Sequence, residues 1–135
     1  LPDRQFAVGE LTAVNIADNS YDAIFLIASF HHLVDGAERR ELLKKIFKGL
    51  KPGGRLLMTN WNLWQGKYLP NLVKWPQKKV SWNDFFIPWG PSDHRSWRYY
   101  HGFTSSELRR LIKLSGLSLD RQEAVNHNLV TLAHK

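Results

Sequence analysis

Residues 61–103 combine cationic and aromatic side chains in a way that suits the binding of phosphates and bases. All six tryptophans of the chain lie here, together with Tyr68, Tyr99, Tyr100, Phe85, Phe86 and Phe103. The segment contains six Lys and Arg residues and two acidic residues, Asp84 and Asp93, so its net charge is positive. Cations grip phosphates and aromatic rings stack on bases, so the pattern favours a nucleic-acid ligand. The alternative is that most of these rings pack on one another as a small second core.

The same segment contains four of the six prolines of the chain. We therefore expect an irregular connection, with at most one short helix near residues 69–75. A connection of this length inside a compact domain is usually functional. The segment is therefore predicted to be a lid over a binding site.

A second group of candidate residues follows an apolar run. Residues 23–28 are apolar without alternation, which predicts a strand buried on both faces in the middle of a parallel sheet. The run ends in Ser29-Phe30-His31-His32. Ligands of open α/β sheets bind at the carboxyl ends of strands, so residues 28–32 should line a site. Glu10, after a β-prone segment at residues 4–8, could present a carboxylate to a ligand or be a solvated loop residue.

The segments around this run predict an α/β fold. Asp35 and Glu38 have the spacing of a capping box ahead of an apolar stripe at helical period, which predicts a helix over residues 37–50. Residues 51–54, Lys-Pro-Gly-Gly, end it. Residues 55–61 then form a second apolar strand. Strand, helix and strand make a right-handed βαβ crossover with parallel strands.

The C-terminal part predicts one more helix and a strand pair. Thr104 and Glu107 form another capping box, and the helix that they open continues to Ser115, before Gly116. Residues 117–123 and 128–133 are β-like, with a short loop around Asn126 between them. We expect these two strands to pair antiparallel at one edge of the sheet.

Size, charge and composition narrow the class of protein. The 135 residues suffice for one domain. The formal net charge of +7 suits phosphate-bearing partners, or a solvated basic surface without a partner. The absence of Cys excludes disulfides, a Cys-based zinc site and a thiol nucleophile, and it fits a reducing compartment. No run is long enough to span a bilayer, so we expect a cytoplasmic protein without a membrane contact.

Four motifs in order resemble the downstream half of the class I S-adenosylmethionine-dependent methyltransferases, of the type 11 domain. They are Gly9-Glu10, residues 17–22, Phe30-His31-His32-Leu33 and residues 50–57. The resemblance implies a Rossmann-like class I methyltransferase fold with an antiparallel C-terminal strand pair, and S-adenosyl-L-methionine as cofactor. Residues 1–135 would be a partial methyltransferase domain, and residues 61–103 a basic aromatic insertion that serves as its substrate lid.

The resemblance also implies which residues bind the cofactor. Glu10 stands where the family generally has the Asp that meets the adenine amino group, and Leu11 would flank the adenine. The turn that passes the methionine part, mainly through backbone atoms, would be Ile27, Ala28 and Ser29. His31 and His32 match a common family pair. We expect no metal site, because the sequence suggests no third ligand.

Two further motifs resemble the tRNA wobble-uridine methyltransferases that esterify a carboxymethyluridine. They are residues 84–89, Asp-Phe-Phe-Ile-Pro-Trp, and residues 98–103, Arg-Tyr-Tyr-His-Gly-Phe. The positions that match the features of this subgroup are Asp84, Trp89, Arg98, Tyr99, Tyr100 and His101. The resemblance implies tRNA as a partner. Eukaryotic members of the subgroup work with a small zinc-binding activator protein.

A carboxylate acceptor is already deprotonated near neutral pH, so it needs an orienting cation rather than a general base. Arg98 is the candidate, because a guanidinium holds a carboxylate bidentately. We expect Arg98, Tyr99 and Asp84 to form the catalytic group. Substrate binding is expected from Trp89, Tyr100 and His101, with a ring stacked on the uracil. The alternatives are an edge strand over residues 98–100 and a structural role for His101.

One departure from the family concerns the cofactor. The glycine-rich turn after the first strand and the acidic residue that ends the second strand are absent. Since the chain also begins with Leu1, we expect a partial protein that lacks about two βα units, on the order of 50–70 residues, and is inactive alone. Two other functions stay open: a methyltransferase of small molecules, and a non-catalytic RNA-binding or scaffold domain.

Overall fold

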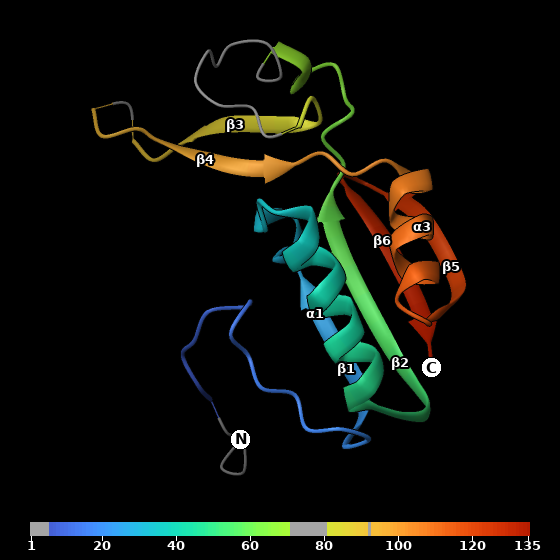
Figure 1. The fold of residues 1–135 in the computed structure, drawn as a ribbon. Helices are drawn as coiled ribbons and strands as arrows, with labels where there is room; N and C mark the ends of the chain where they lie inside the picture. Colours follow the sequence, from blue (N-terminus) through green and yellow to red (C-terminus); the bar gives the residue numbers. More distant parts are fainter. Residues whose placement is uncertain (1–5, 71–80, 92) are drawn as a thin grey trace.

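The computed structural model describes residues 6–70, 81–91 and 93–135, and it contains two sheets (Figure 1). The larger sheet has the strand order β1-β2-β6-β5, and the smaller one is the pair β3-β4. The elements are β1 (Tyr21–Ile27), η1 (Phe30–His32), α1 (Gly36–Gly49), β2 (Leu50–Trp61), β3 (Asp84–Trp89), β4 (Ser96–His101), α3 (Ser105–Leu114), β5 (Ser118–Val125) and β6 (Asn128–His134). No helix in the described part of the chain has the length and apolar character needed to cross a bilayer.

The predicted βαβ crossover is confirmed. β1 pairs parallel to β2, with Ile24 opposite Leu56. Asp35 caps α1 by accepting a hydrogen bond from the Ala37 amide at 2.7 Å. The bounds of α1 agree with the helix predicted over residues 37–50. Gly53 follows with a φ of +76°, the left-handed conformation that glycine adopts without steric cost.

The predicted C-terminal helix and strand pair are also confirmed. Thr104 caps α3 by accepting a hydrogen bond from the Glu107 amide at 3.2 Å. β5 and β6 pair antiparallel, with Ala124 opposite Leu129, and Asn126 makes the turn with a φ of +53°. β6 also pairs antiparallel with β2, so the strand pair completes one side of the larger sheet.

The main core lies between the larger sheet and the two helices, which cover one of its faces (Figure 1). Its fully buried side chains include Leu43, Ile46, Leu56, Met58, Leu108 and Ile112. Phe30 and Phe103 extend this core beyond the carboxyl ends of the strands, where their rings stack with centroids 5.3 Å apart. The stack joins the loop after β1 to the segment before α3, and so it fixes the surroundings of the candidate site.

The prediction that residues 23–28 are buried on both faces is wrong. Leu26 is buried beneath α1, but Phe25 and Ile27 on the other face are 62% and 58% exposed. The second face of β1 is exposed because no described helix covers it. β1 is also the outermost strand on its side of the described sheet and not a central one. The strand expected at residues 4–8 is not formed over residues 6–8, and residues 4 and 5 lie outside the described part.

Residues 61–103 are more regular than the sequence predicted. Instead of an irregular connection, β3 and β4 form an antiparallel hairpin, with Phe85 opposite Tyr100 and Ile87 opposite Arg98. On one face of this hairpin, the side chains of Phe85, Ile87 and Tyr100 are buried in a second core. This core also contains Leu63, and Trp61, Trp64 and Tyr68 pack against it. Part of the aromatic segment therefore packs on itself. Most of the short helix predicted near residues 69–75 lies outside the described residues.

Candidate active site

The carboxyl ends of β1 and β2 are joined at Ala28. The Ala28 amide donates to the backbone oxygen and to Oγ1 of Thr59, both at 3.1 Å. Ala28 has a φ of +49°, which non-glycine residues rarely adopt, so its neighbours must hold this turn in place. Ile27 is exposed and Ser29 is half-buried. The three residues assigned to the methionine part of a cofactor thus form an accessible turn at the predicted edge of the sheet.

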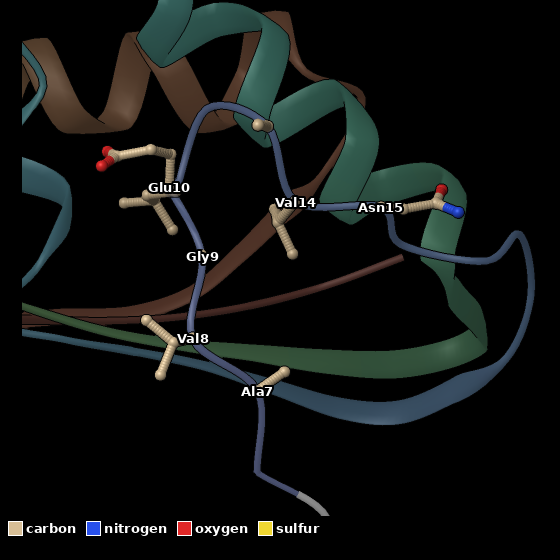
Figure 2. Close-up of a pocket in the computed structure, with 8 residues that line it drawn as sticks. Ala7, Val8, Gly9, Glu10, Val14 and Asn15 are labelled. Atoms are coloured by element: carbon tan, nitrogen blue, oxygen red, sulfur yellow. The ribbon is translucent and has the colours of Figure 1, made fainter.

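Glu10 and Leu11 lie on the loop before β1, which forms a cavity of about 420 Å³ (Figure 2). All residues that line this cavity fall between Ala7 and Asn15, and Glu10 is exposed. Leu11 also lines an apolar groove of about 270 Å³ against residues of β1 and α1. The loop with the predicted adenine residues therefore packs beside the strand that ends in the Ala28 turn.

His31 is buried in the loop after β1. Its Nδ1 accepts a hydrogen bond from the Trp61 amide at 3.1 Å, so the neutral ring carries its proton on Nε2. Burial, together with the charge of His32, lowers the pKa of His31 to about 3. Its Nε2 is a buried donor without a hydrogen-bond partner in the described part of the chain. No group of three His, Cys, Asp or Glu side chains among the described residues is arranged to hold a metal ion.

The lowered pKa of His31 predicts a loss of stability in acid. Above pH 6.5 the ring is neutral in both states, and its contribution is complete. Between pH 6.5 and about 3 the unfolded chain binds a proton at His31 that the folded chain does not, so the free energy of unfolding decreases as the pH is lowered. The expected slope is at most about 1.4 kcal/mol per pH unit, or roughly 2–3 kcal/mol between pH 6 and 4. Urea unfolding at several pH values measures it.

His31→Gln is the variant that isolates this effect, because glutamine can accept the Trp61 hydrogen bond but does not titrate. The variant should lose stability less steeply between pH 6 and 4 than the unmodified chain. The carboxylates of the protein contribute equally to the pH dependence of stability in both proteins. Parallel curves for the two proteins would contradict the assignment of this acid sensitivity to His31.

The β3-β4 hairpin contacts the loop after β1 through backbone and ring contacts. His32 Nδ1 lies 3.1 Å from the backbone oxygen of Tyr99. The ring of Tyr100 stacks on Trp61 with centroids 4.9 Å apart, and it also contacts His31 and His32 at 5.2 and 4.6 Å. The predicted substrate residue Tyr100 is therefore buried beside the carboxyl ends of the strands, where it packs and is not free to stack on a base.

The predicted substrate and catalytic residues separate onto the two faces of the hairpin. Arg98 and Trp89 share one face with Tyr100, and the guanidinium carbon of Arg98 lies 4.4 Å from the centroid of the Trp89 ring. Both side chains are exposed. Tyr99, His101 and Asp84 lie on the opposite face. The structure therefore brings together two smaller groups instead of the single cluster that the motif suggested.

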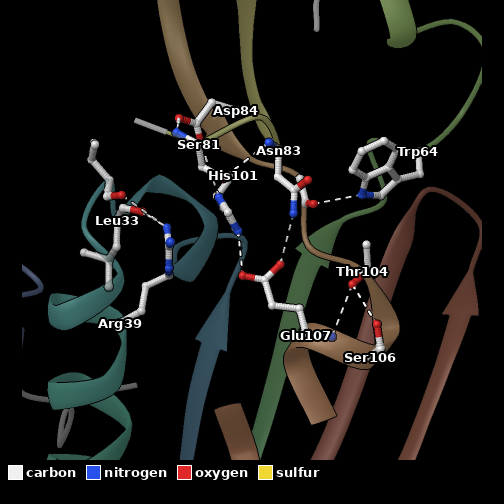
Figure 3. Close-up of polar contacts among 12 residues, drawn as sticks. Leu33, Arg39, Trp64, Ser81, Asn83, Asp84, His101, Thr104, Ser106 and Glu107 are labelled. Atoms are coloured by element: carbon white, nitrogen blue, oxygen red, sulfur yellow. Dashed lines mark hydrogen bonds and ion pairs between the residues drawn. The ribbon is translucent and has the colours of Figure 1, made fainter. Parts of the chain in front are cut away.

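The second group is a buried polar network (Figure 3). Tyr99 Oη donates to Asp84 Oδ1 at 2.9 Å. Figure 3 shows His101 beside the same carboxylate, with Nδ1 3.3 Å from Oδ1. The Ser81 amide donates to Asp84 Oδ2 at 2.7 Å. On its other side, His101 Nε2 lies 2.8 Å from Glu107 Oε1. Asp84 and His101 are 1% and 2% exposed, so both are inside the protein.

The network shifts the proton affinities of two of its members. Burial, and then the hydrogen bond to Asp84, raises the pKa of Tyr99 well above its usual range, so this hydroxyl stays protonated and donates. For Glu107, burial acts to raise the pKa, but the hydrogen bond and charge of His101, the charge of Arg39 and the hydrogen bond of Asn83 together outweigh it and leave the pKa lowered. Glu107 is therefore ionised at neutral pH.

Two residues of this site were not recognised in the sequence. Glu107 was expected only as part of a helix cap, and its bond to His101 depends on how β4 meets α3. Arg39 lies outside the apolar stripe of α1, and a charged side chain at such a position is usually exposed, but Arg39 is buried. Its guanidinium donates to the Leu33 carbonyl at 2.8 Å and lies over the Phe103 ring. The one available signal was the position of Arg39 in the first turn of its helix, beside the predicted site.

Comparison with known proteins gives consistent matches. A family model described as a methyltransferase domain matches residues 2–58. A demethylmenaquinone methyltransferase of Paenarthrobacter aurescens is 30% identical over 127 residues, which cover 82% of this chain and 49% of that protein. The chain spans about half the length of the curated relatives that it matches.

Solved structures show the same fold. A SAM-dependent methyltransferase of Methanosarcina mazei has a TM-score of 0.81 at 20% identity, over 97% of this chain and 66% of that one. A methyltransferase in complex with the Trm112 methyltransferase activator of Haloferax volcanii has a TM-score of 0.63 at 17% identity, over 96% and 60%. The chain therefore has the Rossmann-like fold of the S-adenosylmethionine-dependent methyltransferases.

Proposed function

We propose that the complete protein transfers a methyl group from S-adenosylmethionine to a carboxymethyl-type modified wobble uridine of tRNA, in the cytoplasm. The observation that carries this proposal is the hairpin beside the strand ends. It presents Arg98 stacked on the exposed Trp89 ring, and His32 ties it to the loop after β1. A cation held on an aromatic face can contact the carboxylate or phosphate of a nucleotide while a ring stacks on its base.

The described residues fit the part of the cofactor that they would hold. The backbone at Ala28 turns away from β1 with a positive φ, which leaves the end of this strand accessible. Ile27, Ala28 and Ser29 would contact the methionine part there, and Glu10 and Leu11 the adenine. When bound, S-adenosylmethionine supplies an electrophilic methyl group.

The remaining work of the protein is to position the acceptor. A carboxylate needs no base at neutral pH, so no proton has to leave it during the transfer. Arg98 would hold this carboxylate by charge-assisted hydrogen bonds and fix its angle of approach. Trp89 would supply the ring for the uracil, because Tyr100 is already packed between Trp61 and the two histidines.

A methyltransferase of small molecules is the second candidate. The similarity to a demethylmenaquinone methyltransferase favours it, since that name denotes a quinone substrate. On this reading, the exposed aromatic side chains of the hairpin would cover an apolar acceptor. The two candidates differ in whether the complete protein binds and methylates tRNA.

The first test is calorimetric titration of S-adenosylhomocysteine into the 135-residue chain and into the product of the complete gene. We expect binding by the complete product and weak or no binding by the chain alone, because the chain lacks a glycine-rich turn. Methylation assays with tRNA and with quinones then separate the two candidates. If neither protein binds S-adenosylhomocysteine, the enzyme proposal fails and a non-catalytic RNA-binding or scaffold role takes its place.

We also propose a small zinc-binding activator protein as a partner of the complete protein. The structural similarity to a methyltransferase bound to the Trm112 activator supports this proposal. Co-expression with such an activator should raise the yield of soluble, cofactor-binding protein. Equal yield and equal cofactor affinity with and without the activator would contradict it.

A further inference from the structure

His101 lies between two carboxyl groups that belong to different elements. Asp84 Oδ1 of β3 faces its Nδ1 at 3.3 Å, and Glu107 Oε1 of α3 faces its Nε2 at 2.8 Å (Figure 3). A neutral imidazole has one N–H, so it can satisfy only one of these acceptors. The imidazolium has two, and both of its bonds would be charge-assisted. The geometry therefore fits a doubly protonated ring.

The surrounding groups agree with this protonation state. Glu107 is ionised because its pKa is lowered. Asp84 also accepts hydrogen bonds from the Tyr99 hydroxyl and the Ser81 amide, an arrangement that suits an acceptor without a proton of its own. Arg39 of α1 contributes an opposing positive charge nearby, as its effects on Tyr99 and Glu107 show. Two carboxylates against one guanidinium leave a net negative surrounding for the His101 ring.

The bridge joins the hairpin to the main fold. Glu107 belongs to the first turn of α3, which Thr104 caps, and it also lies 3.5 Å from the Asn83 side chain ahead of β3. Trp64 Nε1 adds one bond to the Gly102 carbonyl. The hairpin also carries Arg98 and Trp89, so any shift of β4 against α3 would displace them relative to the strand ends.

We propose that His101 is a positioning residue: its imidazolium ties β3 and β4 to α3 and thereby holds the hairpin, with Arg98, over the carboxyl ends of β1 and β2. The consequence for acceptor affinity rests on the proposed function. His101 itself is fully occupied by its two carboxylates and is not available to take a proton from a substrate. The bridge is also distinct from the residues assigned to the cofactor, which lie in the Ala28 turn and in the loop with Glu10.

The test uses two variants and one control in the 135-residue chain. Glu107→Gln removes one charge but keeps a hydrogen-bonding side chain. Because Glu107 is partly exposed, we expect this variant protein to fold. His101→Gln removes the cation. The control is His134→Gln. His134 belongs to β6 and is also paired with a carboxylate, since its Nδ1 lies 2.7 Å from Asp120 Oδ1 in β5.

Nitrogen-15 NMR at neutral pH should show protons on both ring nitrogens of His101. Hydrogen exchange of the β3 and β4 amides should become about tenfold faster or more in Glu107→Gln and His101→Gln, because a charge-assisted bond is lost. Exchange in β1, β2 and β6 should stay unchanged in these two variants, and His134→Gln should leave the exchange of the β3 and β4 amides unchanged. A neutral His101 ring, or unchanged hairpin exchange in both variants, would overturn the proposal.

The same variants in the complete gene product separate this inference from the proposed function. We expect KM for the tRNA acceptor to rise about tenfold, with the affinity for S-adenosylhomocysteine unchanged, which a general loss of stability would not produce. If the unmodified protein neither binds nor methylates tRNA, the proposed function fails. The NMR and exchange results still decide whether His101 holds the hairpin.

Discussion

Replacing Phe103 with Ala is expected to lower the free energy of unfolding by about 3–5 kcal/mol. Phe103 is 1% exposed, and its ring stacks on Phe30 with centroids 5.3 Å apart. The His101 ring lies at an angle of 72° to it, with centroids 4.6 Å apart. Arg39 lies over it with the guanidinium carbon 5.7 Å from the centroid. The ring thus fills the junction of the loop after β1, the start of α1 and the end of β4. A methyl group there would leave a cavity that these separately anchored elements cannot close.

Urea unfolding of Phe103→Ala and of Phe103→Leu measures this effect. Leucine keeps part of the buried volume, so it should restore a large share of the lost stability. Trp82→Ala is the control, because Trp82 is 77% exposed and its removal should change stability by about 0.5 kcal/mol or less. A loss below about 1 kcal/mol in Phe103→Ala would mean that the junction does not depend on this ring.

The elements with local signals were predictable from the sequence. Asp35 and Thr104 each cap the helix that their spacing with a Glu predicts, and Gly53 adopts the positive φ that a turn there requires. The crossover rule then determines that β1 and β2 are parallel, and the short loop at Asn126 determines that β5 and β6 are antiparallel. Each of these signals depends on residues close together in the chain.

The environment of each element was less predictable, because it depends on what packs against it. The apolar side chains of Phe25 and Ile27 suit burial on both faces, but the sequence of a strand does not reveal whether a second layer is present. Arg39 is charged and looks like a surface residue. It is buried because its long side chain reaches the Leu33 carbonyl and lies on an aromatic ring.

The candidate site was predicted in its residue types but not in its arrangement. Asp84, Tyr99 and His101 were recognised from their motif, and the structure shows that they contact one another. Arg98 was expected with them, but strand alternation turns it to the opposite face. The hairpin had to be known before this separation could be seen, and its pairing is not encoded by a tight turn signal near Gly90.

Arg98→Ala is expected to reduce methyl transfer to a carboxylate acceptor by up to about 100-fold. A bidentate bond from a guanidinium to a charged group contributes up to about 3 kcal/mol, and each 1.36 kcal/mol is about tenfold in rate. Arg98 is exposed and contacts Trp89 at 4.4 Å, so its loss should change the stability of the chain by no more than about 1 kcal/mol. The affinity for S-adenosylhomocysteine should not change, because Arg98 is not among the residues assigned to the cofactor.

Two companion variants make the result specific. Arg98→Lys keeps the charge but loses the planar fork of donors, so we expect it to recover only part of the rate. Arg95→Ala removes another exposed arginine of the same hairpin region, just ahead of β4, and should leave the rate within about threefold of the unmodified protein. If the rates of Arg98→Ala and Arg95→Ala fall equally, the basic charge of the hairpin attracts tRNA without orienting its carboxylate. Full activity of Arg98→Ala would remove the cation from the proposed mechanism, since Arg39 already donates to the Leu33 and Val34 carbonyls and cannot easily replace it.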